Sequence, residues 1–262
     1  MSISTKLVRF AAVTATIMAL GAGSVFAQAT KIKIGTEGAY PPFNTLTADG
    51  KLEGFDIDIA NALCEEMKAK CEFVTQDWDG MIPALQAGKF DAIIASMSIT
   101  PERLEKVDFT NKYYNTPPAI AAPKDTDIKG VTKEDLAGKT IGAATSTTHF
   151  NYSTATYTES EIKGYPSSQE FLLDLASGRL DAVNDDILVL EGWLKSPDGA
   201  CCKLVGSIEL VPEIHGPGMG IAVRKGESEL VTKFNAAIDA IRANGKYKEI
   251  NDKYFEFDVY GG

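Results

Sequence analysis

The chain has few basic residues, few histidines and cysteines, and almost no long apolar runs. Beyond the first 27 residues, no segment approaches the roughly 20 apolar residues that a membrane-spanning helix needs, so we expect the processed chain to be soluble. Asp and Glu total 36 against 26 Lys and Arg, giving a formal net charge of -10 at pH 7. Such a surface repels nucleic acids and anionic lipids, and neither is expected as a partner.

The first 27 residues are the exception to this polar pattern. Lys6 and Arg9 precede an apolar run, residues 10–20, and Val25-Phe26-Ala27 ends the segment with a small residue. This order is typical of a secretory signal peptide with cleavage after Ala27. The mature chain is therefore expected to begin at or very near Gln28 and to be exported.

Export permits disulfides, and the chain has 4 cysteines. Cys64 ends a predicted helix and Cys71 begins a predicted strand, so the two can meet across the turn, and we interpret them as a structural disulfide. Neither His149 nor His215 lies near them in sequence, so we expect no metal site and no cofactor. Cys201 and Cys202 are adjacent, which leaves their state open.

Short apolar segments alternate with helical patterns, which is typical of a parallel α/β sheet. The first series comprises strands over 31–36, 71–75 and 91–95 and helices over 56–67, capped by Asp56, and 80–86, with a further helix opening at Thr100-Pro101. A second series follows the polar segment 124–127, with strands over 140–144 and 181–183 and helices near 169–176 and through Trp193. Leu85–Ala92 and Leu175–Ala182 resemble each other, so the pattern favours two lobes of like construction.

The end of the chain predicts a crossing between lobes. A Gly-Pro-Gly cluster at 216–218 precedes a strand over 220–223 and one long helical tail from Glu227 to Tyr254. Returning this tail to the first lobe makes the chain cross twice. Ligands of open α/β sheets bind beyond the carboxyl ends of the strands, so a hinged cleft between lobes is expected.

Three motifs give the chain a family resemblance: residues 35–43 (GTEGAYPPF), 54–58 (GFDID) and 98–103 (SITPER). With them the sequence resembles the periplasmic solute-binding proteins for polar amino acids, especially those for lysine/arginine/ornithine, histidine and opines. The family's basic-amino-acid binders also carry a disulfide at Cys64 and Cys71. The resemblance implies a periplasmic, monomeric α/β protein with the two-lobed type II fold, residues 28–115 and 216–262 forming lobe 1 and residues 116–215 lobe 2. It implies delivery of the ligand to an ABC permease and ATPase complex.

The resemblance also implies roles for individual residues. It places Tyr40 and Trp78 on the faces of the ligand side chain, Arg103 on its α-carboxylate, Asp186 on its α-amino group and Glu37 on a distal cation. Further ligand-binding positions implied are Ser96, Ser98, Thr147, Thr148 and His149. Ala95, Ala144 and His149 differ from the residues usual in lysine and arginine binders, which leaves the exact ligand open.

The residues themselves support part of this interpretation and offer alternatives. Arg103 follows Thr100-Pro101 within one helical turn, where its guanidinium and free backbone N–H groups suit an anion. An indole beside acids, as at Trp78, suits a cation. Asp186 also suits a helix cap, and Glu37 a solvated loop acid.

We therefore expect reversible capture of a free amino acid, with no catalytic residues. Because Arg103 and Asp186 account for the α-carboxylate and α-amino groups, Glu37 remains as a third charge, which favours lysine, arginine, ornithine, histidine or a cationic opine. The alternatives are an exported dehydratase, using Glu37, His149 and Asp186 as acid and base, and a ligand sensor.

Overall fold

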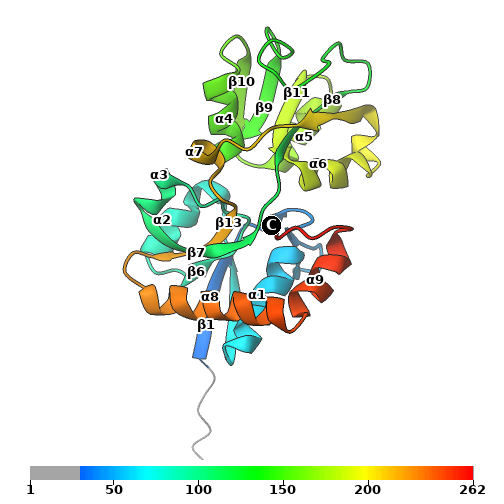
Figure 1. Ribbon diagram of the computed structural model, residues 1–262. Helices are drawn as coiled ribbons and strands as arrows, with labels where there is room; N and C mark the ends of the chain where they lie inside the picture. The colour runs from blue at the N-terminus through cyan, green and yellow to red at the C-terminus, as the bar shows by residue number, and fades with distance from the viewer. Residues whose placement is uncertain (1–29, 262) are drawn as a thin grey trace, which may run out of the picture.

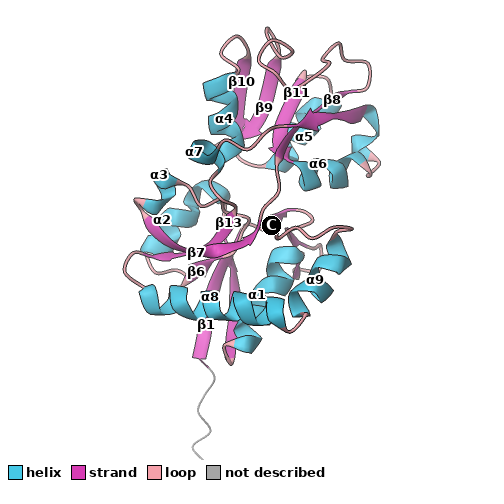
Figure 2. Ribbon diagram, in the orientation of Figure 1, coloured by secondary structure: helices cyan, strands magenta, loops and turns pink. Residues whose placement is uncertain are grey.

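The computed structural model describes residues 30–261, which form two α/β lobes, one above the other in Figures 1 and 2. The predicted signal peptide and its cleavage site lie outside the described residues. The predicted two-lobed α/β fold is confirmed, since two separate five-stranded sheets each carry helices on their faces. A small antiparallel sheet, β2 (Ala39–Tyr40), β3 (Asn44–Leu46) and β4 (Leu52–Glu53), accompanies the first lobe.

The first sheet has the strand order β5-β1-β6-β13-β7. Strands β1, β5 and β6 are parallel, and β13 is antiparallel to β6 and β7. Its strands are β1 (Thr30–Thr36), β5 (Ala69–Thr75), β6 (Ala92–Ile93), β7 (Val107–Tyr114) and β13 (Met219–Arg224); its helices are α1 (Phe55–Glu66), η1 (Trp78–Gly80), α2 (Met81–Gln86), α3 (Pro101–Leu104), α8 (Ser228–Ala243) and α9 (Lys246–Tyr254). The pattern therefore predicted β1, α1, β5, α2, β6, the start of α3 and β13 to within a few residues, and it gave no prediction for β7.

The second sheet repeats this plan with the order β10-β9-β11-β8-β12. Strands β9, β10 and β11 are parallel, while β8 is antiparallel to β11 and β12. Its strands are β8 (Pro118–Pro123), β9 (Thr140–Ala144), β10 (Glu161–Tyr165), β11 (Ala182–Asp186) and β12 (Cys202–Ser207); its helices are α4 (Thr148–Thr156), α5 (Ser168–Ala176), α6 (Ile187–Leu194), η2 (Asp198–Cys201) and α7 (Pro212–His215). The equivalent strand orders explain why the segments Leu85–Ala92 and Leu175–Ala182 resemble each other in sequence.

Two sequence expectations about helices are wrong. Gly54, not Asp56, is the N-cap of α1, and Asp56 is fully buried, accepting hydrogen bonds from Asn44, Ser96 and Tyr113. The predicted single tail is two helices, α8 and α9. They are separated at Gly245, whose φ of 85° lies in the left-handed region that glycine adopts without steric cost.

The chain passes from the first sheet to the second between β7 and β8 and returns between β12 and β13. The return contains α7 and Gly216, whose φ is 69°. A side chain at Gly216 would meet the carbonyl oxygen of Ile99 at 1.7 Å, so only glycine fits this crossing. The Gly-Pro-Gly cluster of the sequence thus lies at one of the two connections between the lobes.

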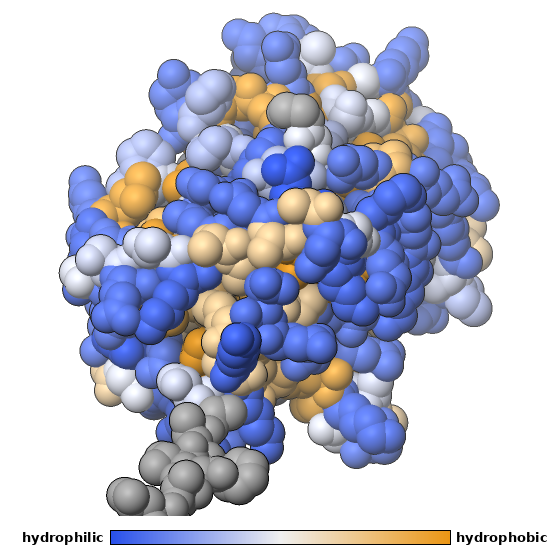
Figure 3. Space-filling model, turned by 60° about the horizontal axis from the view of Figure 1, so that its bottom comes forward, coloured by the Kyte–Doolittle hydropathy of each residue, from blue (hydrophilic) through white to orange (hydrophobic). Residues whose placement is uncertain are grey.

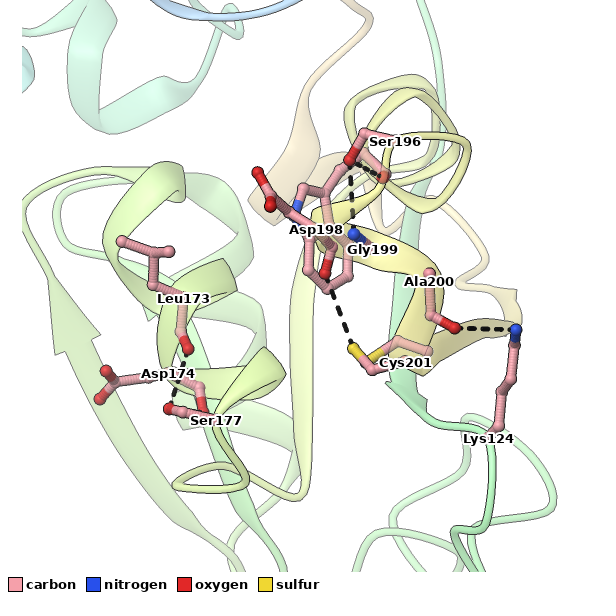
Figure 4. Close-up of a disulfide and its surroundings, with 11 residues drawn as sticks. Lys124, Leu173, Asp174, Ser177, Ser196, Asp198, Gly199, Ala200 and Cys201 are labelled. Atoms are coloured by element: carbon pink, nitrogen blue, oxygen red, sulfur yellow. Dashed lines mark hydrogen bonds between the residues drawn. A yellow bond between two sulfur atoms is a disulfide. The ribbon is translucent and has the colours of Figure 1, made fainter.

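Both cysteine pairs are disulfide-bonded. Cys64 and Cys71 join the end of α1 to β5, with Cα atoms 5.8 Å apart, which confirms the predicted pairing. The adjacent Cys201 and Cys202, whose state the sequence left open, are also bonded to each other, at the junction of η2 and β12 on the second lobe. Cys201 is exposed, and it lies beside Asp198 and Ala200 in Figure 4. The Ala200 carbonyl oxygen accepts a hydrogen bond from Lys124.

The surface of residues 30–261 is mostly polar, with small apolar areas dispersed among hydrophilic ones on the face in Figure 3. The large apolar side chains with the greatest exposure, Leu46, Leu104, Leu173 and Phe257, belong to separate segments. No helix in this part of the chain is long and apolar enough to cross a bilayer.

Candidate functional site

A cavity of about 40 Å³ lies between the two lobes. Its walls come from segments that follow the carboxyl ends of the parallel strands of both sheets, where ligands of open α/β sheets bind. The lining residues from the first lobe are Glu37, Tyr40, Trp78, Ala95, Ser96, Ser98 and Arg103; those from the second are Ala144, Thr147, Thr148, His149, Ser168 and Asp185. The structure therefore brings together every site residue predicted from the sequence except Asp186.

Arg103 supplies the positive charge of the cavity. Its Nη1 and Nη2 atoms donate to the carbonyl oxygens of Ser98 (3.0 Å) and Ser146 (2.9 Å), and the residue is 7% exposed. Burial lowers its pKa to about 10, so the guanidinium stays charged at neutral pH. A guanidinium has five N–H donors, so donors remain for a ligand carboxylate.

The local sequence explains why Arg103 points inward. Thr100 is the N-cap of α3, accepting a hydrogen bond from the Arg103 backbone N–H at 3.3 Å, and Pro101 occupies the first helical position. This helix has only 4 residues. A helix this short has almost no dipole, so the Arg103 guanidinium is the charge that this segment presents to the cavity.

Tyr40 and Trp78 reach from the first lobe to the second. The Tyr40 hydroxyl donates to Asp185 Oδ1 at 2.6 Å, and the Trp78 indole N–H donates to the Ser146 carbonyl oxygen at 3.2 Å. The Arg103 guanidinium carbon lies 5.2 Å from the centre of the Trp78 ring, within cation–π range. The two aromatic residues therefore line the cavity and also hold the lobes together.

Two neighbouring acids at the end of β11 have different roles. Asp185 lines the cavity and accepts hydrogen bonds from Tyr40, from Ser168 Oγ (2.5 Å) and from the Asp186 backbone N–H (2.8 Å). Asp186 is not among the lining residues: its side chain caps α6 by accepting from the Leu188 N–H at 2.8 Å, and it also bonds Thr116. Asp185, and not the predicted Asp186, therefore lines the cavity.

Glu37, in the turn between β1 and β2, is the other acid in the cavity wall. Its pKa is raised to about 7, first by burial and then by the negative charges of Asp185, Asp77 and Asp79. Among residues 30–261, no lysine, arginine or histidine forms an ion pair with Glu37. This carboxyl group is therefore an unpaired acid facing a cavity.

The loop after β6 presents Ser96 and Ser98. Ser96 has a φ of 55°, an uncommon conformation for a residue other than glycine, and its backbone N–H donates to the Tyr113 hydroxyl at 3.0 Å. Its own hydroxyl donates to Asp56 Oδ2 at 3.0 Å. The buried Asp56 thus holds this loop in place, a role that the sequence did not indicate.

The start of α4 completes the wall from the second lobe. Thr147 is the N-cap, accepting from the Phe150 N–H at 3.1 Å, and Thr148 and His149 follow it into the cavity wall. His149 Nδ1 lies 3.4 Å from Asp185 Oδ1. Burial lowers the His149 pKa, an effect that Asp185 opposes and Arg103 reinforces.

Comparisons with known proteins agree with this geometry. The profile of the bacterial extracellular solute-binding proteins, family 3, matches residues 32–257. The chain belongs to that family. It is 50% identical to an L-arginine-binding protein of Pseudomonas aeruginosa over 98% of both chains, and 41% identical to ABC transporter arginine-binding protein 1 of Escherichia coli, over 87% of this chain and 91% of that one. Among solved structures, a Salmonella typhimurium periplasmic binding protein described as highly specific for arginine aligns with a TM-score of 0.79 and 36% identity, covering 87% of this chain and all of the other.

In this solute-binding protein, two lining residues escaped the predictions made from the sequence. Asp185 was missed because two adjacent aspartates end a buried strand, and the pattern does not show which faces the cleft. Ser168 was missed because a serine at a helix start usually serves the helix itself. Its hydrogen bond to Asp185 is visible only once β11 and α5 are packed together.

Proposed function

We infer that the chain binds a free amino acid with a cationic side chain, arginine foremost, in the periplasm and delivers it to an ABC importer. The observation that carries this inference is Glu37, a half-buried acid that faces the cavity and has no cationic partner among the described residues. A buried carboxylate is costly unless an opposite charge accompanies it, so the ligand is expected to supply that charge.

The cavity offers a partner for each group of such a ligand. The Arg103 guanidinium is placed to bind the α-carboxylate, and Asp185 to bind the α-ammonium group. Glu37 then takes the distal cation, and Tyr40 and Trp78 provide aromatic surfaces for the side chain. Ser96, Ser98, Thr147, Thr148 and His149 contribute polar atoms to the wall around the α-carbon. Ala95 and Ala144 are small, which leaves room for a long side chain such as that of arginine or an opine.

The proposal assigns no reaction to the site. His149 and Asp185 are adjacent, as an acid and base pair must be, but the relatives reported above are named as binding proteins. An exported dehydratase is therefore less well supported than a binding protein, and the same holds for a sensor. The names of those relatives also support the periplasm as the location and an ABC transporter as the partner; we propose that the chain acts there as a monomer.

A melting-temperature panel with a calorimetric follow-up tests the function. Lysine, arginine, ornithine, histidine and a guanidinium-bearing opine should raise the melting temperature more than glutamine, glutamate or leucine, because preferential binding stabilises the folded state. Glu37→Gln should weaken the binding of arginine by roughly 1.5–3 kcal/mol, which is the contribution of a hydrogen bond to a charged group. It should change the binding of glutamine little.

Arg103→Ala is the matched control, because it removes the group for the α-carboxylate that all amino acids share. It should weaken the binding of every ligand by roughly 2–5 kcal/mol. A larger melting-temperature rise with glutamine or glutamate than with every cationic compound would refute the ligand class. Disappearance of arginine during incubation would instead show a reaction.

A further inference from the structure

Three acids, Asp77, Asp79 and Asp185, lie near enough to Glu37 for their charges to act on it, and Glu37 differs from them in its surroundings. Asp77 precedes η1 and Asp79 lies within it. Both are exposed, so water solvates their charges. Asp185 is buried but accepts hydrogen bonds from Tyr40, Ser168 and the backbone, with His149 also beside it. Glu37 is half-buried, and its side chain accepts no such hydrogen bonds from the described part of the chain. The negative charges of the other three acids act on it.

The basic side chains of the cavity wall, Arg103 and His149, both contact groups other than Glu37. Arg103 donates to the carbonyl oxygens of Ser98 and Ser146, and His149 faces Asp185. When no cation from outside is present, a proton is therefore the simplest neutralising partner for Glu37. Burial and the three neighbouring acids place its pKa at about 7, within the range in which an exported protein works.

We propose that Glu37 carries a proton until a cationic side chain enters, that capture of the cation releases this proton to solvent, and that ambient pH thereby sets the preference of the site between cationic and neutral side chains. This inference rests on the proposed function. The protonated carboxyl group is a hydrogen-bond donor, which suits the amide oxygen of a glutamine-like side chain. The ionised carboxylate suits a guanidinium or ammonium group. One residue thus serves two ligand classes, in proportions that pH determines.

The sign of the effect follows from linkage. Above the pKa of Glu37 there is no proton to displace, so arginine affinity is at its maximum and independent of pH. Below it, displacement costs free energy, and affinity should fall by up to about tenfold per pH unit. Glutamine affinity should stay level or rise over the same interval. The ratio of arginine to glutamine affinity should therefore drop roughly tenfold to a hundredfold between pH 7.5 and pH 5.5.

Other groups near the cavity also titrate, and the experiment must separate them. The pKa of buried Asp186 is raised to about 7 and that of Asp56 to about 6, in both cases mainly by burial, whereas burial lowers that of His149. Asp186 and Asp56 do not line the cavity themselves, and both accept hydrogen bonds from protein groups. These groups remain in the Glu37→Gln variant, so the difference between that variant and the unmodified protein isolates Glu37.

The test is calorimetry of arginine and glutamine binding to the mature protein at pH 5.5–8.5, in pairs of buffers that differ in ionisation enthalpy. Arginine should release about half a proton at pH 7, nearly one at pH 6 and almost none at pH 8.5. Glutamine should release none. Glu37→Gln should abolish the arginine-linked release, while Glu53→Gln, at an exposed glutamate of β4, should leave it unchanged.

The outcomes separate this inference from the function on which it rests. Tight arginine binding that releases no proton between pH 6 and pH 7.5 overturns the coupling and leaves the cation-binding function intact. Release that persists in Glu37→Gln assigns the proton to another group and also overturns it. Absence of arginine binding at pH 8.5 contradicts the proposed function itself. Proton release by the unmodified protein needs no variant, so the coupling is measurable even if Glu37→Gln folds poorly.

Discussion

At the scale of single residues, Asp185 and Asp186 are neighbours with opposite tasks. Asp185→Asn should weaken amino-acid binding by about tenfold to a hundredfold, because it removes the charge that we propose as the partner of the ligand's α-ammonium group. Its melting temperature should change little, since the amide oxygen can still accept from Tyr40 and the amide nitrogen can donate to the Ser168 hydroxyl oxygen. Asp186→Ala should do the reverse, costing about 1 kcal/mol of stability through loss of the α6 cap and leaving affinity within about threefold. Calorimetry and urea unfolding of both variants measure the two effects; a larger affinity loss in Asp186→Ala would reverse the assignment.

This pair also shows how far sequence reasoning reaches at this scale. Most of the residues that line the cavity were predictable, because the family resemblance implies ligand-binding roles for these positions. The position of one acid was not. Adjacent residues of a strand face opposite sides, so a shift of one residue replaces the residue that lines the cavity with the one that caps α6. Both aspartates are buried, so burial does not distinguish them either.

At the scale of elements, the two disulfides differ in what they can stabilise. Cys64 and Cys71 are 7 residues apart, whereas Cys201 and Cys202 are adjacent, so the second bond restricts the unfolded chain much less. Replacing Cys64 and Cys71 together by serine should lower the free energy of unfolding by about 2–3 kcal/mol, and the same change at 201 and 202 by about 1 kcal/mol or less. Urea unfolding of both double variants measures the difference. Equal losses would contradict an account based on loop length.

Element boundaries were predictable where local chemistry decides them and not where tertiary packing does. Thr100 and Pro101 predicted the start of α3 correctly because a cap and a helix-compatible proline act within one turn. Asp56 looked like a cap for the same reason, but its carboxylate serves the buried contacts with Ser96 and Tyr113, which lie 40 and 57 residues further along the chain. Such distant partners leave no local signal.

At the scale of the whole molecule, the lobes are joined by contacts that do not all involve the proposed ligand site. Tyr40, Trp78 and Arg103 bridge the lobes from within the cavity wall. Thr145 bridges them from outside it, its Oγ lying 3.2 Å from Asp79 Oδ2. The similarity between the two halves of the sequence predicted two lobes. The position of one lobe relative to the other depends on these individual contacts.

Thr145 therefore offers a way to alter lobe closure without touching the ligand. Thr145→Val keeps the shape of the side chain and removes its hydroxyl, which lies 3.2 Å both from Asp79 Oδ2 and from the Tyr165 carbonyl oxygen of its own lobe. Because the contact with Asp79 joins the lobes, the closed arrangement should lose up to about 1 kcal/mol. If the lobes close before or during tight binding, the affinity for every ligand should fall by the same factor of about five. The reason is that only the population of the closed state has changed. Thr145→Ser retains the hydroxyl and should bind normally. Calorimetry with arginine and lysine, together with small-angle scattering with and without arginine, measures affinity and closure. A change in the ratio of arginine to lysine affinity would show that Thr145 acts on the ligand directly and not through the lobes.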